Sequence, residues 1–214
     1  MRIDIATLFP EMCEAVLGES IIGRARRAGK LEIHCHNIRD YTQDKHRRVD
    51  DTPYGGGKGM LMQTEPIYNC YQAVCEMIAA KPHVIYMSPK GQPFSQQRAI
   101  ELREYENIFI LCGHYEGVDQ RVLDEIVDEE ISLGDYVLTG GELGALVVAD
   151  AVGRLCPGVL SETSSPITVF AAAGGAVERT PCQHPQMAAG AVDFGNSKKT
   201  SRPAVACHRR RKAG

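Results

Sequence analysis

The sequence has no apolar run long enough to cross a membrane, because no stretch of about 18 consecutive apolar residues occurs in it. The first twelve residues, MRIDIATLFPEM, carry acidic residues inside their apolar stretch and lack a small-residue cleavage site. No signal peptide is therefore expected, and we expect a cytoplasmic protein without membrane contact. The hydrophobic fraction of 43% is that of a folded globular chain with a sizeable core.

Paired cysteines are also missing. The chain has eight cysteines, and none of them forms a C-x-x-C pair. His34 and His36 alternate as on a strand and have no cysteine pair to complete a zinc site. The sequence therefore predicts reduced thiols and no structural metal ion.

A strong positive charge is absent from the main body of the chain. The formal net charge is −3, but residues 161–214 carry +5 and residues 1–160 carry −8. Binding of nucleic acid by residues 1–160 would therefore depend on a local basic patch.

The first third of the chain alternates between strand and helix patterns. RIDIATLF (2–9) and LEIHCHNI (31–38) alternate as strands, and PEMCEAVLGESIIGRARRAG (10–29) predicts one helix that ends at Gly29. Residues 39–60 are polar and glycine-rich and predict a long loop, which is expected to be either functional or disordered. EPIYNCYQAVCEMIAAK (65–81) predicts a helix with Ile67, Tyr71, Val74 and Ile78 on one face.

Three short apolar strands then lead into glycine-bearing loops. HVIYM (83–87) enters the turn SPKGQPF, NIFILC (107–112) enters GHYEGVD, and EEISLGDYVL (129–138) ends in TGGE before the helix LGALVVADAVGRL. This alternation predicts an α/β fold with a mostly parallel sheet. A ligand site is expected beyond the carboxyl ends of these strands.

The stretch PYGGGKGM (53–60) invites comparison with nucleotide-binding loops. A P-loop needs Ser or Thr after the lysine, but Lys58 is followed by Gly59, and no strand leads directly into the stretch. A G-x-G-x-x-G fingerprint starting at Gly55 would need glycine where Met60 stands. Neither template fits.

Several of these segments together resemble one known family. SIIGRA, NIRDYTQDKHRRVDDTPYGGGKGM, LCGHYEGVDQR, LGDYVLTGGEL and DAVGRLCPGVL occur in the order found in bacterial tRNA (guanine-N1)-methyltransferases of the SPOUT class, the TrmD family. The resemblance runs from Met1 to about Leu160. It implies a SPOUT-type parallel sheet flanked by helices, with a deep trefoil knot. It also implies a homodimer with active sites at the subunit interface, S-adenosylmethionine as methyl donor, and N1 of the guanine 3′ of the tRNA anticodon as acceptor.

The resemblance assigns residues to the donor and to the substrate. The donor residues come from the three strand-end loops: Tyr86, Ser88, Pro89, Gly91, Gly113, Tyr115, Glu116, Leu133, Gly134, Asp135, Tyr136, Val137, Leu138, Thr139, Gly140 and Gly141. The substrate residues are Asp50, Tyr54, Gly55, Gly56, Gly57, Lys58 and Gly59. The glycines would let the backbone approach a flipped-out guanine or the donor, and Lys58 would face a tRNA phosphate.

The reaction needs a base for the N1 proton and a cation for the charge that spreads to O6. The resemblance assigns the cation to Arg154; an exposed pair with Asp150, one turn earlier, is the alternative. Glu116 is assigned to the donor or to a Mg²⁺ ion, with a solvated turn carboxylate as the alternative. His114 receives no catalytic role.

An RNA-facing surface is the expectation for part of the loop at 39–60. Its candidates are Lys45, Arg47, Arg48, Asp50 and Asp51, and a solvated loop is the alternative.

The family pattern stops at about Ser161. The acidic linker that carries the family's catalytic aspartate, and the helical domain after it, are not recognisable, and Asp193 is not assigned as the base. We therefore expect a SPOUT methyltransferase domain at 1–160 and a divergent, mostly disordered tail at 161–214. The tail arises by frameshift or recombination near codon 160, or marks a genuine separate lineage. A cofactor- or RNA-binding remnant with little or no catalysis is the alternative function.

Overall fold

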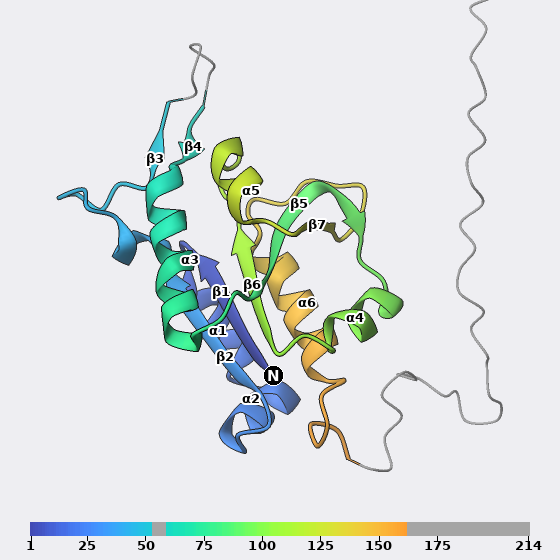
Figure 1. Cartoon of the computed structure of the whole chain (residues 1–214). Helices are drawn as coiled ribbons and strands as arrows, with labels where there is room; N and C mark the ends of the chain where they lie inside the picture. Colours follow the sequence, from blue (N-terminus) through green and yellow to red (C-terminus); the bar gives the residue numbers. More distant parts are fainter. Residues whose placement is uncertain (53–58, 162–214) are drawn as a thin grey trace, which may run out of the picture. The chain divides into compact units, whose positions relative to one another are not determined.

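A five-stranded parallel sheet forms the centre of the fold (Figure 1). The computed structural model describes residues 1–52 and 59–161. The strands are β1 (Arg2–Thr7), β2 (Glu32–Asn37), β5 (His83–Pro93), β6 (Asn107–Cys112) and β7 (Glu129–Ser132), in the order β2-β1-β6-β5-β7. Every neighbouring pair in this sheet is parallel. The predicted α/β class and parallel sheet are confirmed.

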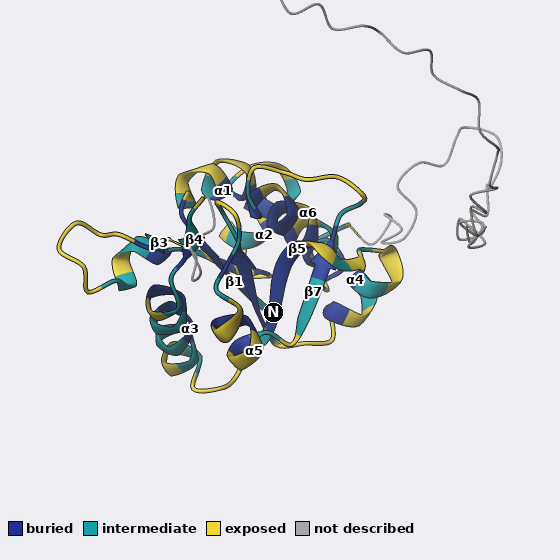
Figure 2. Cartoon of the chain, turned by 90° about the horizontal axis from the view of Figure 1, so that it is seen from above, coloured by how far each residue is buried: buried dark blue, intermediate teal, exposed yellow. Residues whose placement is uncertain are grey.

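Helices cover both faces of the sheet (Figure 2). The helices α1 (Pro10–Leu17), α2 (Ser20–Arg27), α4 (Gln96–Leu102) and α6 (Glu142–Gly153) pack on one face, and α3 (Thr64–Ile78) and α5 (Gln120–Ile126) pack on the other. Strand residues alternate between the two cores, so Ile85 belongs to one and Tyr86 to the other. Burial on both faces explains why these strands read as nearly continuous apolar runs.

The single helix predicted for residues 10–29 is wrong. The chain forms two helices that are separated at Gly18 and Glu19. Ser20 has a φ of 52°, in the left-handed region, which a continuous right-handed helix cannot contain. The two helices meet so closely that a Cβ on Gly23 would stand 1.9 Å from the carbonyl oxygen of Gly18.

The predicted loop at 39–60 contains some regular structure. The 3-10 helix η1 (Ile38–Tyr41) opens it, and β3 (Asp50–Asp51) pairs antiparallel with β4 (Leu61–Met62). Val49 is fully buried and anchors the segment to the core. Residues 53–58, which include most of PYGGGKGM, lie outside the described residues.

The strand predicted at 83–87 extends further, because β5 continues to Pro93, and the turn predicted at SPKGQPF lies within this strand as a break in its pairing. The pairing of β5 with β7 is interrupted between Met87 and Gln92 and then resumes. The residues between them leave the ladder at that point. None of the helices in the described part of the chain is long and apolar enough to cross a membrane.

Candidate active site

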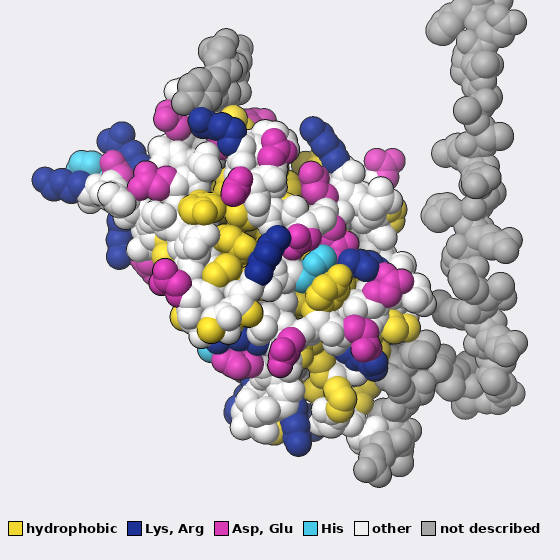
Figure 3. Space-filling view, in the orientation of Figure 1, with side chains coloured by type: hydrophobic (Ala, Val, Ile, Leu, Met, Phe, Trp, Pro, Cys, Tyr) yellow, Lys and Arg dark blue, Asp and Glu magenta, His cyan; other side chains and the backbone are white. Residues whose placement is uncertain are grey.

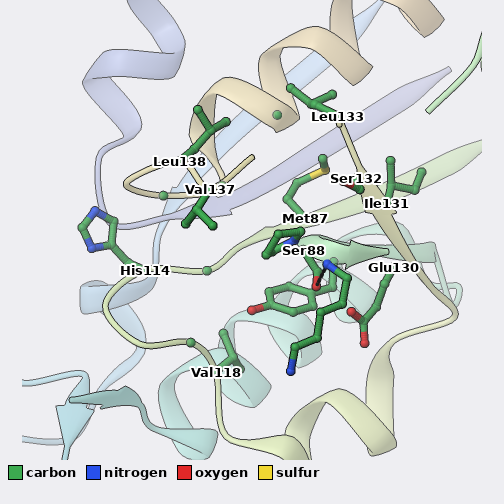
Figure 4. A pocket seen from close by; sticks show the side chains of 18 of the residues that line it. Met87, Ser88, His114, Val118, Glu130, Ile131, Ser132, Leu133, Val137 and Leu138 are labelled. Carbon is green, nitrogen blue, oxygen red and sulfur yellow. Dashed lines mark hydrogen bonds between the residues drawn. The ribbon is translucent and has the colours of Figure 1, made fainter. Parts of the chain in front are cut away.

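Three segments meet at one edge of the sheet: the part of β5 that leaves the pairing with β7, and the loops that follow β6 and β7. We call them the first loop (86–91), the second loop (113–117) and the third loop (133–141). The three strands are neighbours in the sheet and run parallel, so their carboxyl ends lie along the same edge. A cleft of about 290 Å³ lies between the loops (Figure 4).

The cleft brings together nearly all residues that the sequence assigned to a methyl donor. It is lined by Tyr86, Ser88, Pro89, Gly113, Tyr115, Glu116, Leu133, Tyr136, Val137, Leu138, Thr139, Gly140 and Gly141. The remaining three, Gly91, Gly134 and Asp135, are not among the lining residues. Gly91 packs against β7, where a Cβ would stand 2.5 Å from the carbonyl carbon of Glu130. The turn around Gly134 is held by Ser132, whose hydroxyl donates to the Gly134 carbonyl at 3.1 Å.

Close backbone contacts fix the three loops to one another. The Gly141 N–H donates to the Gly113 carbonyl at 2.9 Å. A Cβ on Gly141 would stand 2.7 Å from the Cα of Cys112, and a Cβ on Gly113 would stand 2.8 Å from the hydroxyl of Tyr86. Glycine is therefore needed at both positions for the loops to approach this closely.

The walls of the cleft are largely apolar, with charged groups at a few places. Figure 4 shows Val118 and Glu130 on the side opposite to Val137 and Leu138. Burial raises the pKa of the Tyr86 phenol, and the charge of Glu130 raises it further. The phenol therefore stays neutral at pH 7 and can donate a hydrogen bond.

Charged side chains among the lining residues are Lys90, Glu116 and Glu130. Carboxylates of this kind suit a ligand that carries positive charge, such as a sulfonium or an ammonium group. Across the described residues, no group of three or more His, Cys, Asp and Glu side chains could hold a metal ion.

The stem of the glycine-rich stretch packs against the second loop. The Glu116 N–H donates to the Met60 carbonyl at 3.1 Å, and the Met62 N–H donates to the Gly117 carbonyl at 3.0 Å. A Cβ on Gly59 would stand 2.3 Å from the Cγ of Glu116. Asp50 pairs with Met62 across the short β3–β4 ladder. Two predicted substrate residues, Asp50 and Gly59, thus lie on the stem of a segment docked beside the cleft, whereas Tyr54, Gly55, Gly56, Gly57 and Lys58 lie outside the described residues.

The segment between η1 and β3 is exposed and carries several cations. Figure 3 shows Lys and Arg side chains and a histidine at its projecting end. Lys45, Arg47 and Arg48 are exposed, and Arg47 forms an ion pair with Asp40 at 3.2 Å. Arg39, at the base of the segment, donates to the Tyr115 hydroxyl of the second loop at 3.4 Å. A segment with several basic side chains, interspersed with the exposed Asp40 and Asp44, therefore reaches the second loop.

Known proteins share both the sequence and the fold. The sequence matches the family tRNA (Guanine-1)-methyltransferase TrmD over residues 1–172. The chain belongs to this family. The chain is 55% identical over 165 residues to a tRNA (guanine-N(1)-)-methyltransferase of Ruminiclostridium cellulolyticum, which covers 77% of this chain and 71% of that protein. It is also 55% identical over 170 residues to the protein of the same name from Alkaliphilus oremlandii, covering 77% and 68%.

A solved structure supports the same assignment. The tRNA (m1G37) methyltransferase from Aquifex aeolicus superposes with a TM-score of 0.70 at 44% identity, over 76% of this chain and 72% of that one. The fold is therefore the SPOUT fold of the TrmD family, as the sequence predicted. The trefoil knot stays a prediction.

Arg154, to which the family resemblance assigned a catalytic role, lies far from the cleft. It follows Gly153 at the carboxyl end of α6, whereas Gly140, Gly141 and Gly144 line the cleft at the amino end. Twelve helical residues separate the two ends, which corresponds to about 18 Å at 1.5 Å per residue. Arg154 is therefore not brought together with the donor residues of its own chain.

The sequence missed several residues that line the cleft of this TrmD family member. They are Met87, Lys90, His114, Gly117, Val118, Gln120, Leu123, Glu130, Ile131, Ser132 and Gly144. Five of the eleven directly precede or follow residues that were predicted, namely Met87, Lys90, His114, Gly117 and Ser132. Ser132 could have been found from its position at the end of β7, one residue before Leu133. Glu130 and Lys90 carried no signal, because strand and loop charges are usually solvated.

Proposed function

We propose that this chain transfers a methyl group from S-adenosylmethionine to N1 of the guanine 3′ of the anticodon in tRNA. The observation that carries the proposal is the cleft at the carboxyl ends of β5, β6 and β7, lined by residues of all three loops. The family and the names of its relatives support this reaction.

The cleft has the chemical character that the donor requires. S-adenosylmethionine supplies an activated methyl group on a sulfonium. Leu133, Val137 and Leu138 offer apolar walls for its adenine, and Ser88 and Thr139 offer hydroxyl groups. Glu116 and Glu130 would stabilise its positive charge. A Mg²⁺ ion beside Glu116 belongs to the same hypothesis, and addition of EDTA to the assay tests it.

The acceptor side of the proposal uses the neighbouring segments. Asp50 and Gly59 would flank the guanine together with Tyr54, Gly55, Gly56, Gly57 and Lys58. Lys45, Arg47 and Arg48 would contact tRNA phosphates, which position the substrate without reading its sequence. Since tRNA is the substrate, we place the protein in the cytoplasm. We assign no residue as the base that takes the N1 proton.

We further propose that two copies of the chain form a homodimer and complete each site together. An exposed apolar stripe on α1 and α6 supports this, with side chains that are each 42–56% exposed: Phe9, Met12, Val16, Leu143 and Val147. The two helices pack against each other, and exposed apolar side chains on neighbouring elements are typical of an interface. A second copy docked there would bring its Arg154 towards the first copy's cleft, which that copy's own Arg154 does not reach.

The division of the chain belongs to the proposal. We assign residues 1–160 to the methyltransferase domain, and residues 161–214 to a tail in place of the family's linker and helical domain. The trefoil knot is part of the proposed fold of residues 1–160.

The test is methyl transfer from labelled S-adenosylmethionine to an unmodified tRNA transcript. We expect label in a transcript with guanine 3′ of the anticodon and none in a matched transcript with adenine there. Calorimetry measures donor binding separately. If the chain binds the donor but transfers no methyl group, it is a cofactor-binding remnant and not an active enzyme. If it binds neither the donor nor tRNA, both the methyltransferase function and the remnant are excluded.

A further inference from the structure

One buried nitrogen beside the cleft has no partner among the described residues. It is Nδ1 of His114, the first side chain after Gly113 in the second loop. A buried nitrogen without a hydrogen bond is costly, so such an atom calls for an explanation. The imidazole contacts two aromatic rings, with its centroid 5.2 Å from that of Phe9 and 5.2 Å from that of Tyr115.

The opposite edge of the ring faces the third loop. The Cδ2 of His114 lies 2.8 Å from the place where a Cβ on Gly140 would stand. The Oε2 of Glu142 lies 2.3 Å from the same place. The two atoms are therefore neighbours across Gly140, whose missing side chain leaves the space between them.

Glu142 is a buried carboxylate held at one oxygen. It is 4% exposed, and its Oε1 accepts a hydrogen bond from the hydroxyl of Thr7 at 2.8 Å. Thr7 is itself fully buried and accepts from the Phe9 N–H at 2.9 Å. These bonds fix the carboxylate, so that Oε2 is the oxygen directed at Gly140 and His114. Burial raises the pKa of the adjacent Cys112 thiol, and the negative charge of Glu142 raises it further.

A half-turn of the imidazole about its Cβ–Cγ bond exchanges Nδ1 with Cδ2 and leaves the shape of the ring unchanged. The ring contacts with Phe9 and Tyr115 are compatible with both orientations for that reason. In the turned orientation, Nδ1 leaves the place where it has no partner and faces Oε2 of Glu142. We propose that His114 and Glu142 form a positioning pair, in which Nδ1–H donates to Oε2 across Gly140 and holds the second and third loops in the arrangement that binds the donor.

The His114–Glu142 pair rests on the proposed function, because it supports the cleft that we propose for the donor. It gives His114 a positioning role and not a catalytic one. The pair joins the loop after β6 to the first residue of α6. It reinforces the backbone bond from Gly141 to Gly113 with a charge-assisted hydrogen bond. A positioning pair of this kind affects binding of the donor more than the rate of transfer from bound donor.

Three substitutions at His114 separate the atoms involved. Asn places an N–H near the position of Nδ1, Gln places one near Nε2, and Phe keeps the ring without nitrogen. We expect His114→Phe and His114→Gln to raise the dissociation constant of S-adenosylmethionine about tenfold, the effect of one hydrogen bond to a charged group. We expect His114→Asn to stay within about threefold of the wild-type chain, and the kcat of all three to change less than KM.

The outcomes that overturn the pair are distinct. Equal donor affinity in all variants, or a loss in His114→Asn as large as in His114→Phe, excludes the bond to Nδ1. If the variants weaken dimerisation and leave donor affinity unchanged, the partner of Nδ1 lies on the second copy of the chain, and the pair with Glu142 is excluded.

A measurement on the unaltered chain keeps the test valid if a variant fails to fold. The ¹⁵N resonances of the His114 imidazole in the donor complex report which nitrogen carries the proton. We expect protonated Nδ1, and an Nδ1 without a proton overturns the pair. If the wild-type chain binds no donor at all, the proposed function fails, and that result is distinguishable because it precedes every comparison of variants.

Discussion

At the scale of single residues, the cleft depends on glycines that have no room for a side chain. Gly140 is the sharpest case, because a Cβ there would stand 2.3 Å from Oε2 of Glu142 and 2.8 Å from the ring of His114. Both neighbours have packing or bonding partners of their own: Glu142 accepts a hydrogen bond from Thr7, and His114 contacts the rings of Phe9 and Tyr115. We therefore expect Gly140→Ala to weaken donor binding at least tenfold, measured by calorimetry.

A matched control for this substitution lies away from the cleft. A Cβ on Gly29 would meet nothing within 4 Å, but its φ of 64° is left-handed. Gly29→Ala should cost about 1–2 kcal/mol of folding free energy and leave donor affinity unchanged. If Gly140→Ala binds the donor normally, the third loop adapts and the close approach is not needed.

A second residue, Asp4, carries a buried charge that the reaction does not use. Its carboxylate is fully buried, accepts from Arg2 Nε at 2.8 Å and lies 2.7 Å from Nε2 of His36. Burial alone would raise the pKa of Asp4, but the bonds to His36 and Arg2 outweigh it and the pKa is lowered. Because the pKa of Asp4 is lower in the folded chain than its ordinary value of 3.8, the ionised carboxylate stabilises the fold at pH above 3.8. This contribution is lost as the pH falls from 3.8 through the lowered pKa of the folded chain.

We expect Asp4→Asn to lower the free energy of unfolding by about 3 kcal/mol at pH 7, because Arg2 and His36 lose the buried carboxylate that they share and Arg2 keeps, among the described residues, only the exposed Glu32 as a counter-charge. Urea denaturation at pH 7 and pH 3 checks both size and sign, since the difference from wild type should shrink at pH 3. Asp124→Asn, at an exposed carboxylate bonded only to Gln120 among the described contacts, should change stability by less than about 0.5 kcal/mol. A deficit in Asp4→Asn that does not shrink with acid would contradict the ionised pair.

At the scale of elements, helix α6 contributes to the site in three ways, through its amino end, its carboxyl end and its exposed face. Its amino end contributes to the cleft, its carboxyl end carries Arg154, and its outer face exposes Leu143 and Val147 beside α1. An aspartate in the middle of an apolar interface would be desolvated without a partner. Val147→Asp should therefore raise the dissociation constant of the proposed dimer about 100-fold or more and abolish methyl transfer, while donor binding by each copy persists.

Sedimentation velocity measures the dimer, and α3 provides the control. Met77 is 54% exposed and lies on α3, on the other face of the sheet. Met77→Asp should leave both the dimer and the activity intact. Val147→Asp that remains dimeric would show that the stripe on α1 and α6 is not the interface.

At the scale of the whole molecule, the sequence predicted what local patterns encode and missed what distant packing decides. The face of α3 and the strands β1 and β6 follow from apolar spacing, and the three loops follow from their position at strand ends. The break at Gly18 and the continuation of β5 beyond Met87 depend on contacts with other elements, which no local pattern contains. Equally, His114 and Glu142 are far apart in sequence and meet only because β6 and α6 are neighbours in space.

The separation of Arg154 from its own cleft gives a prediction for the dimer as a unit. At a donor concentration near the wild-type dissociation constant, Arg154→Ala and Gly140→Ala should each have little activity alone, the first because it lacks the arginine and the second because its donor binding is weakened at least tenfold. When equal amounts of the two are mixed and allowed to exchange subunits, half of the dimers carry one copy of each. In these dimers the intact cleft of one copy faces the intact Arg154 of the other copy, and the second site carries both substitutions. One of two sites in half of the dimers is therefore active, and about a quarter of wild-type activity should return.

The control mixes Arg154→Ala with a chain that carries both Arg154→Ala and Gly140→Ala, and it should restore no activity. If the first mixture also stays inactive after exchange has been verified by sedimentation or mass spectrometry, each chain works with its own arginine. Helix α6 would then have to rearrange to carry Arg154 across about 18 Å.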